Sequence, residues 1–460
     1  MGMTRDPEGR SDVMERDWTK GSIIGNLWSL SWPMTISSTI MILGPTIDMI
    51  WVGKLGAASI AGVGVSGIAV MSVNALIFGL FTGLRALVAR FVGAGEAQEA
   101  NHVSQQAFVI GIAFSIFTAV IGIFLAEPIL LLLGLEADVV AEGAAYMRIM
   151  LIGMVTMSGG MLAQSVMQAS GDAITPMQIG IATRIFHVAL CPFLVFGWWV
   201  FPRLGVTGAA LTGVISQGAG GAILLWALFS GRTRLRLTLR NFHFDGDIIW
   251  RMIKIGIPSS ITMIQINLTN MILMWFIAPF GTLAVAAHSL VGRVDGFIQM
   301  PAMGLGQAAG VLAAQNLGAE QPDRAEKTGW ISIVLYTAIM FVGSLVIWFW
   351  GRNVVGIFSS DPPLVEMSNA FLRIQIVQYM VFGPVIVLMT CLNGVGDTIV
   401  PMVNILVTMW GVQIPLAYFL PKITNLGVYG VRWGIVLAIA VRAIVYLVYF
   451  KLGRWKQKQV

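Results

Sequence analysis

Apolar stretches of about 20 residues or more, separated by short polar turns, make up most of this sequence. A helix of about 20 apolar residues crosses the hydrocarbon core of a bilayer, because each residue adds about 1.5 Å. With 57% hydrophobic and 11% charged residues, the chain is more apolar than a soluble protein, whose apolar share is about 45–50%. The sequence therefore predicts an all-α polytopic membrane protein with twelve transmembrane helices, at roughly 24–52, 61–91, 103–125, 142–169, 176–200, 206–229, 249–278, 284–314, 330–350, 367–394, 400–421 and 428–451.

Lysine and arginine residues gather in alternate turns of the chain. If both termini are cytoplasmic, seventeen of these residues lie on the cytoplasmic side and four lie outside. Cytoplasmic loops carry the excess of lysine and arginine in membrane proteins. We therefore expect a multi-pass protein of the plasma (inner) membrane, with both termini and the basic connector 230–246 in the cytoplasm.

The two halves of the chain are copies of one another, and residue n of the first half corresponds to residue n + 225 of the second. Pro33 thus corresponds to Pro258, and the offset shortens by three before the last span of each half, where Leu204-Gly-Val matches Leu426-Gly-Val. Since each half has six spans, both copies enter the membrane from the same side, as in transporters built from parallel repeats.

This duplication divides the chain into five parts. We expect two pseudo-symmetric six-helix lobes, a solvated N-terminal tail, a C-terminal tail and a linker between the lobes. The boundaries are a cytoplasmic N-terminal tail at 1–20, an N-lobe at 21–229, the basic inter-lobe linker at 230–246, a C-lobe at 247–451 and a cytoplasmic C-terminal tail at 452–460.

Asp48 is the anomaly of the first span. A charged side chain at the bilayer centre costs at least about 2.5–3.5 kcal/mol, so such residues usually have a function. Asp48 lies eight residues before Gly56, about 12 Å inside the end of its helix. Pro45 removes a backbone donor and favours a kink, so we expect Asp48 to titrate beside a hinge at Pro45. The alternative is that Asp48 only bonds local backbone or hydroxyls such as Thr46.

His187 and Cys191 are four residues apart and share one face of the fifth span. If that face meets the first span, His187 could share a proton with Asp48. The alternative is that both residues merely fill the bundle. We expect no metal, because one histidine and one cysteine fall short of the three or four protein ligands usual for zinc. Asp48, His187 and Cys191 are therefore the predicted proton or cation coupling residues.

Polar side chains on other inner spans are candidates to line a substrate cleft. Asp295 and Arg293 are two residues apart and do not face each other on a helix. Asp295 is either part of a structural ion pair or a charge that faces substrate. The predicted cleft residues are Asp295, Arg293, Asn74, Gln265 and Asn267.

The pattern of motifs over about residues 20–452 resembles the multidrug and toxic compound extrusion (MATE) family. The resemblance rests on Gly-Ala turns after spans 2 and 8, Gly-Asp turns followed by proline after spans 4 and 10, and on Pro33, Asp48, Gly53, Gly56 and Leu426-Gly-Val-Tyr-Gly. It implies a V-shaped pair of lobes around a central cleft. It further implies a secondary active multidrug efflux antiporter that exports lipophilic, often cationic, compounds in exchange for H+ or Na+ by alternating access.

The match to the family's N-lobe coupling residues is partial. Asp48 matches the first of them, but the pair expected on span 5 falls on His187 and Cys191, and the threonine expected on span 6 falls on Gly213. Sodium is a hard cation that requires several oxygen ligands, by analogy with calcium and magnesium. A proton needs only one base, so we expect proton coupling more than sodium coupling.

Two other functions remain open at this point. Interior Arg85, Arg184 and Arg293 suit a flippase for a lipid-linked precursor from the same superfamily. A membrane-embedded enzyme is disfavoured, because the sequence has no phosphate-binding loop, no His-Glu-x-x-His and no clustered acids for a metal. We expect a monomer that handles drug-like small molecules in contact with membrane lipid, with no nucleic acid, no nucleotide and no cofactor apart from the coupling ion.

Overall fold

The computed structural model describes residues 16–132, 136–240 and 242–458, apart from the side chains at 42, 43, 45, 57 and 58. The elements are α1 (Ile23–Val52), α2 (Ala57–Ala94), α3 (Ala97–Phe124), α4 (Ala126–Leu132), α5 (Ala137–Ser170), α6 (Ile174–Phe196), α7 (Val206–Ser230), α8 (Gly246–Ile277), η1 (Ala278–Phe280), α9 (Thr282–Gly318), α10 (Pro322–Gly356), α11 (Pro362–Gly394), α12 (Ile399–Thr408), η2 (Met409–Gln413), α13 (Ile414–Ile423), α14 (Val428–Leu452) and η3 (Arg454–Gln457).

Twelve helical segments within the described residues are long and apolar enough to cross a membrane. The prediction of a polytopic all-α protein with twelve spans is therefore confirmed. Two local features were not predicted. The short helix α4 lies between the third and fourth spans, and the eleventh span contains the π-helical turn η2 between α12 and α13. Such single π turns inside α-helices are frequent at functional sites.

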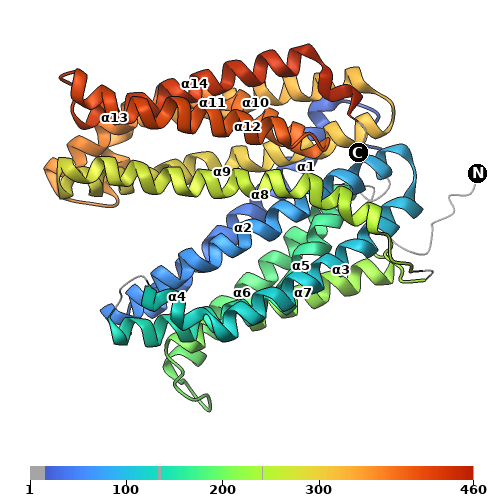
Figure 1. The fold of residues 1–460 in the computed structure, drawn as a ribbon, viewed down its shortest axis with the longest axis horizontal. Helices are drawn as coiled ribbons and strands as arrows, with labels where there is room; N and C mark the ends of the chain where they lie inside the picture. The colour runs from blue at the N-terminus through green and yellow to red at the C-terminus, as the bar shows by residue number, and fades with distance from the viewer. Residues whose placement is uncertain (1–15, 133–135, 241, 459–460) are drawn as a thin grey trace, which may run out of the picture.

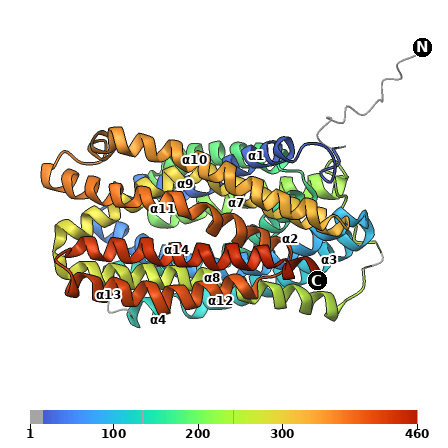
Figure 2. The ribbon, with the colours of Figure 1, turned by 90° about the horizontal axis from the view of Figure 1, so that it is seen from above.

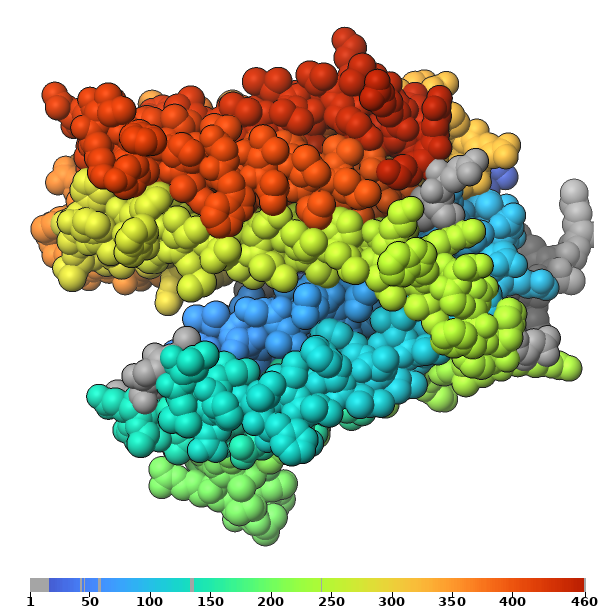
Figure 3. Space-filling view, in the orientation of Figure 1, coloured from blue at the N-terminus to red at the C-terminus, as the bar shows by residue number. Residues whose placement is uncertain are grey.

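The molecule has the shape of a V (Figures 1 and 3). Helices α2 to α7 form one arm, and α8 to α14 form the other, with α1 packed against both α9 and α6. The space-filling view shows the arms parted at one end. At the other end they meet (Figure 1), and Figure 2 shows the C-terminus and the segment that joins α7 to α8 at that same end. We call this closed end the terminal side and the open end the cleft side.

Two hydrogen bonds between the arms confirm the internal repeat. The Ser260 hydroxyl donates to the carbonyl of Leu76 at 2.9 Å. The Thr35 hydroxyl donates to the carbonyl of Pro301 at 3.2 Å. Adding 225 to the number of Thr35 gives Ser260, and adding it to that of Leu76 gives Pro301, so the two bonds are one contact repeated by the pseudo-symmetry.

The backbones of the two arms pack tightly against each other at the terminal side. A Cβ atom placed on Gly93 would lie 2.1 Å from the carbonyl oxygen of Gln315, and one placed on Gly318 would lie 2.0 Å from that of Arg90. The same offset in residue number relates these two contacts. Only glycine permits such close approach of one backbone to another. The closed end of the V therefore depends on a symmetric pair of glycines.

The sixth span of each half begins in the same way at the shorter offset. Gly205 precedes α7 with φ 57° and ψ −130°, and Gly427 precedes α14 with φ 54° and ψ −133°. Residues with a side chain rarely adopt this backbone conformation. The shift of three residues predicted before the last span is confirmed by this shared turn.

The expectation of a solvated N-terminal arm is wrong at Trp18, whereas Asp17 and Lys20 are exposed. The indole of Trp18 is only 1% exposed, and its neighbour Arg16 bonds Asn26 and Ser29 of α1. At the other end of the chain Trp455 is likewise 1% exposed. Burial of a large aromatic ring is strongly favourable, so the described segments that carry Trp18 and Trp455 pack on the terminal side.

Candidate coupling site

Asp48 lies at the centre of a buried contact between α1 and α6. Nε2 of His187 is 2.8 Å from Oδ1 of Asp48, and Sγ of Cys191 is 3.8 Å from the same oxygen. Asp48 is 7% exposed, His187 is 2% exposed and Cys191 is fully buried. The face of α6 that carries His187 and Cys191 thus meets the first span, which is the condition under which the sequence predicted a shared proton.

A third helix completes the surroundings of His187. The Ser216 hydroxyl on α7 lies 3.5 Å from Nδ1 of His187 and also donates to the backbone carbonyl of Thr212. Tyr146 on α5 is close enough to Asp48 to interact with it electrostatically. The carboxylate, the imidazole and two hydroxyl groups therefore come from four helices, α1, α6, α7 and α5.

Arg184 also lies near this site. Its guanidinium occupies the space beside Gly44 of α1, where a Cβ atom would come within 2.3 Å of Nη1. Arg184 interacts electrostatically with Asp48. Its Nε is buried and has no hydrogen-bond partner among the described residues. The pocket therefore holds a cation close to the carboxylate.

The fold adds a third possible metal ligand, Asp48 of α1, to the histidine and the cysteine of α6. The three side chains offer donor atoms that all lie within 4.8 Å of one another. The expectation of no metal here stays a prediction, and the number of ligands no longer supports it.

Asp48 lies nearer the end of its helix than Gly56 indicated. Helix α1 ends at Val52, four residues after Asp48, so the carboxylate is about 6 Å from the helix end rather than about 12 Å. The side chain of Pro45 is outside the described residues, and α1 is continuous through that position. The hinge at Pro45 stays a prediction.

Asp295 occupies a separate polar cluster in the other arm. Nε2 of Gln375 donates to its Oδ2 at 2.9 Å, and the hydroxyl of Tyr379 donates to its Oδ1. Arg432 of α14 interacts with it electrostatically. Arg293 is exposed, as expected for a residue that points away from Asp295.

The other predicted cleft residues lie on α2 and α8. Asn74 and Gln265 each have a buried amide oxygen without a hydrogen-bond partner among the described residues. Along their helix axes they lie about 3 Å and about 7.5 Å beyond the Ser260–Leu76 contact, toward the cleft side. Asn267 is exposed. None of these positions establishes contact with a substrate, so their role stays a prediction.

The sequence model of the MatE family matches the chain twice, at residues 33–193 and 258–419. The starts of the two matches, 33 and 258, are equivalent positions of the repeat. Together the matches cover well over half of the chain. The chain belongs to the MatE family.

Curated relatives of this MatE protein are similar over nearly its whole length. The probable multidrug resistance protein YoeA of Bacillus subtilis is 27% identical over 432 residues, which cover 93% of each chain. The probable multidrug resistance protein NorM of Thermotoga maritima is 23% identical over 442 residues, covering 94% of this chain and 93% of the relative.

Solved structures share its fold. A structure described as MATE in the bent conformation superposes with a TM-score of 0.89 at 21% identity, covering 96% of this chain and 97% of that one. A structure described as the outward-facing conformation of a multidrug resistance MATE family transporter of the MOP superfamily has a TM-score of 0.89 at 22% identity, covering 97% and 98%. The V-shaped fold that the resemblance implied is thereby confirmed.

Sequence reasoning missed Arg442, a second buried arginine of this MatE protein. It is 4% exposed, and its Nε donates to the Thr408 hydroxyl at 2.8 Å, directly before the π turn. Its Nη2 lies 3.4 Å from Oε1 of Gln413, at the end of that turn. The arginine was visible in the sequence of the last span, but only the fold shows that it points inward.

Proposed function

We propose that this MatE protein is a secondary active multidrug efflux antiporter that exports lipophilic, often cationic, compounds in exchange for protons. Asp48 is the principal proton carrier, and His187 and Cys191 complete its site. The observation that carries the proposal is the 2.8 Å contact between Nε2 of His187 and Oδ1 of Asp48, buried between two helices. The names of the relatives as multidrug resistance proteins support the substrate class.

The contact between Asp48 and His187 requires a proton. The hydroxyl hydrogen of Ser216 goes to the Thr212 carbonyl, so Nδ1 of His187 is the donor toward Ser216. Nε2 of His187 then faces Asp48 either with a hydrogen or with a lone pair. Without a proton on Nε2 or on Asp48, two lone pairs would oppose each other at 2.8 Å. The geometry therefore favours a pair that holds one exchangeable proton.

The donor atoms around Asp48 suit a proton better than sodium. His187 supplies a nitrogen and Cys191 a sulfur. Hard cations such as calcium and magnesium take oxygen ligands, and sodium is similar in this respect. Losing the proton from the pair would leave the Asp48 charge beside Arg184 in the same pocket. That change of charge is the step we couple to opening and closing of the cleft.

The orientation follows from the charge bias of the loops. With the termini and the linker 230–246 in the cytoplasm, the parted ends of the arms face outward. In that state the symmetric glycine contacts Gly93–Gln315 and Gly318–Arg90 close the cytoplasmic end. We place the protein in the plasma membrane as a monomer, and release of drug outward follows entry of a proton to Asp48.

The flippase alternative finds less support. A pyrophosphate headgroup requires several cations that converge on one cleft. Arg184 faces Asp48, and Arg293 is exposed on α9. The two reported relatives are named for multidrug resistance. Efflux of drug-like compounds therefore remains the better supported function.

Everted membrane vesicles test the coupling ion directly. Uptake of a fluorescent lipophilic cation such as ethidium is measured with a pH gradient alone and with a sodium gradient alone. We expect uptake with the pH gradient and none above background with the sodium gradient. Vesicles that contain the Asp48→Asn variant provide the control. Sodium-driven uptake at zero pH gradient would overturn proton coupling, and no uptake of any lipophilic cation would overturn the substrate class.

A further inference from the structure

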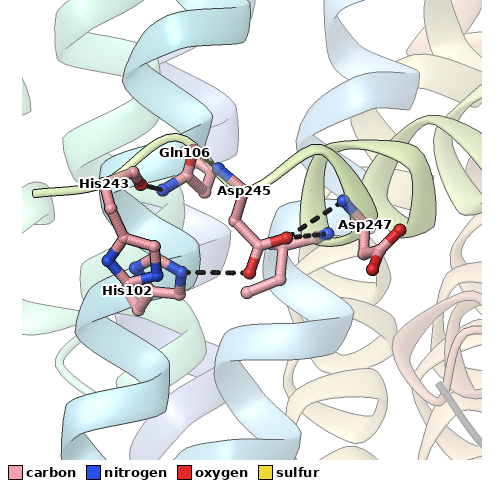
Figure 4. A network of polar contacts seen from close by, with 6 residues as sticks. His102, Gln106, His243, Asp245 and Asp247 are labelled. Atoms are coloured by element: carbon pink, nitrogen blue, oxygen red, sulfur yellow. Dashed lines mark hydrogen bonds and ion pairs between the residues drawn. The ribbon is translucent and has the colours of Figure 1, made fainter.

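Two histidines and an aspartate meet on the terminal side, at a site separate from that of Asp48 (Figure 4). Nε2 of His102 on α3 lies 3.3 Å from Oδ2 of Asp245, the residue that precedes α8. The imidazole rings of His102 and His243 stack with centroids 4.2 Å apart and an angle of 21° between their planes. The two histidines offer one nitrogen each and the aspartate one carboxylate oxygen, all within 4.8 Å of one another.

The carboxylate of Asp245 is held in place for this role. Its Oδ1 accepts hydrogen bonds from the backbone N–H groups of Asp247 and Ile248 at 3.0 and 3.1 Å, which caps α8. Oδ2 is left to face His102 (Figure 4). The two backbone bonds to Oδ1 fix the carboxylate, so Oδ2 is held in the position of a metal ligand beside His102.

Gln106 fixes the backbone between the two ligands of the linker. Its Nε2 donates to the carbonyl of His243 at 2.7 Å, and its Oε1 accepts from the N–H of Asp245 at 3.2 Å. The Gln106 side chain is fully buried. Outer partners of this kind orient metal ligands and raise the affinity of a site.

The linker is also fastened to α3 at Thr238. Asn101 accepts from the N–H of Thr238 at 2.9 Å and donates to its carbonyl at 3.3 Å. Gln105 donates to the same carbonyl at 2.5 Å. Asn101, His102, Gln105 and Gln106 thus form one polar face of α3 that binds the linker from Thr238 to Asp245. His102 is the member of this face that can ligate a metal.

We propose that His102, His243 and Asp245 bind a divalent transition-metal ion of the zinc class, which joins α3 of the N-lobe to the start of α8 of the C-lobe. Zinc takes imidazole nitrogen at about 2.0–2.1 Å and carboxylate oxygen at about 2.0–2.2 Å, so its tetrahedral ligands lie about 3.3 Å apart. The distance of 3.3 Å between His102 and Asp245 already has that value. A small turn of the exposed His243 ring brings in the third ligand, and water supplies the fourth.

Zinc binding to the purified full-length protein, with any polyhistidine tag removed, tests the site. Equilibrium dialysis gives the number of bound ions, and the visible spectrum of the cobalt-substituted protein reports tetrahedral coordination. We expect the His243→Ala and Asp245→Asn variants each to lose one bound ion relative to wild type. Asn at position 245 still caps α8, because its amide oxygen can accept the same two backbone bonds. Loss of the ion in that variant therefore reports the ligand and not the fold.

Two further variants make the test specific. His187→Ala removes a donor from the buried triad of Asp48, His187 and Cys191, and is expected to leave the linker ion in place. Gln106→Met keeps the ligands but removes their outer partner, and should weaken binding by about 10–100-fold. The proposal is overturned if His243→Ala and Asp245→Asn bind as many ions as wild type, or if only His187→Ala loses the ion.

Discussion

Nε2 of His187 lies 2.8 Å from Oδ1 of Asp48, although 139 residues separate them in the chain. The Asp48→Asn variant keeps the size of the side chain and an oxygen for His187, but cannot take up a proton. We expect it to abolish proton movement coupled to drug while leaving drug binding measurable. Binding is followed by fluorescence polarisation of a dye, and coupling by proton release in proteoliposomes. Undiminished coupled efflux by this variant contradicts the role of Asp48.

The His187→Ala variant should behave differently. In our proposal His187 shares the exchangeable proton with Asp48 across their 2.8 Å contact, so its removal changes how efflux depends on pH. We expect the pH optimum of efflux to move, with transport retained. The measurement is a pH profile of efflux at constant proton gradient. A matched control is His288→Ala, which removes a histidine of α9 in the other arm. The same pH profile for His187→Ala and wild type would exclude this role.

The apolar pattern predicts the helices of this protein because lipid demands a nearly unbroken apolar surface. The repeat predicts the pairing of Ser260 with Leu76 and of Thr35 with Pro301, once one of the two contacts is known. The face shared by His187 and Cys191 was likewise readable from their spacing. What the sequence left open was whether that face meets α1, since helix order along the chain does not fix which faces touch.

The linker site could not be predicted in the same way. His102 and Asp245 are 143 residues apart, and the course of the linker has no periodicity that would place it on α3. The docking of Trp18 was missed for a related reason, because the charged residues around it suggested a solvated tail. Polar contacts outside the bilayer depend on which segments pack together, and the pattern of residues in one sequence says little about that packing.

Gly318→Ala should open the closed end of the V. Its new Cβ would lie 2.0 Å from the backbone oxygen of Arg90, which no side-chain movement can relieve. Overpacking of this kind costs about 1–3 kcal/mol. We expect spin labels on the terminal ends of α2 and α9 to move apart. Gly292→Ala, in the same helix, is the control, because a Cβ there meets no atom within 4 Å. Equal distances between the spin labels in the two variants would show that the contact between Gly318 and Arg90 does not keep the terminal side closed.

The orientation in the membrane is tested with single cysteines. Positions 138 and 240 are exposed on opposite sides of the molecule, whereas the native Cys191 and Cys391 are buried. We expect a membrane-impermeant maleimide added to intact cells to label Asp138→Cys and not Arg240→Cys. Permeabilised cells, in which both positions should react, provide the control. Labelling at 240 alone would reverse the topology.

Asp172 and Asp397 are equivalent in the repeat but differ in their partners. Asp397 is fully buried, and it accepts from Tyr449 at 2.5 Å and from Lys458 at 3.1 Å. Asp172 accepts from the Thr175 N–H at 3.1 Å, and its other oxygen is buried without a partner among the described residues. Burial raises the pKa of Asp172. The charge on Asp172 therefore destabilises the fold, whereas Asp397 has Lys458 as a partner for its carboxylate.

The two asparagine variants should thus change the stability of the protein in opposite directions near neutral pH. Because the pKa of Asp172 is higher in the folded protein than in the unfolded chain, its favourable contribution is present below about pH 3.9 and lost as the pH rises through the folded value. The Asp172→Asn variant carries no buried charge at this position and keeps the bond to Thr175. Its unfolding temperature should therefore equal or exceed that of wild type near about pH 7.5. Near about pH 4 its unfolding temperature should not exceed that of wild type. Asp397→Asn should instead lose about 1–3 kcal/mol near neutral pH, because Lys458 loses its anion. Thermal unfolding in detergent at the two pH values measures both effects, and a destabilised Asp172→Asn variant at neutral pH would contradict the assignment.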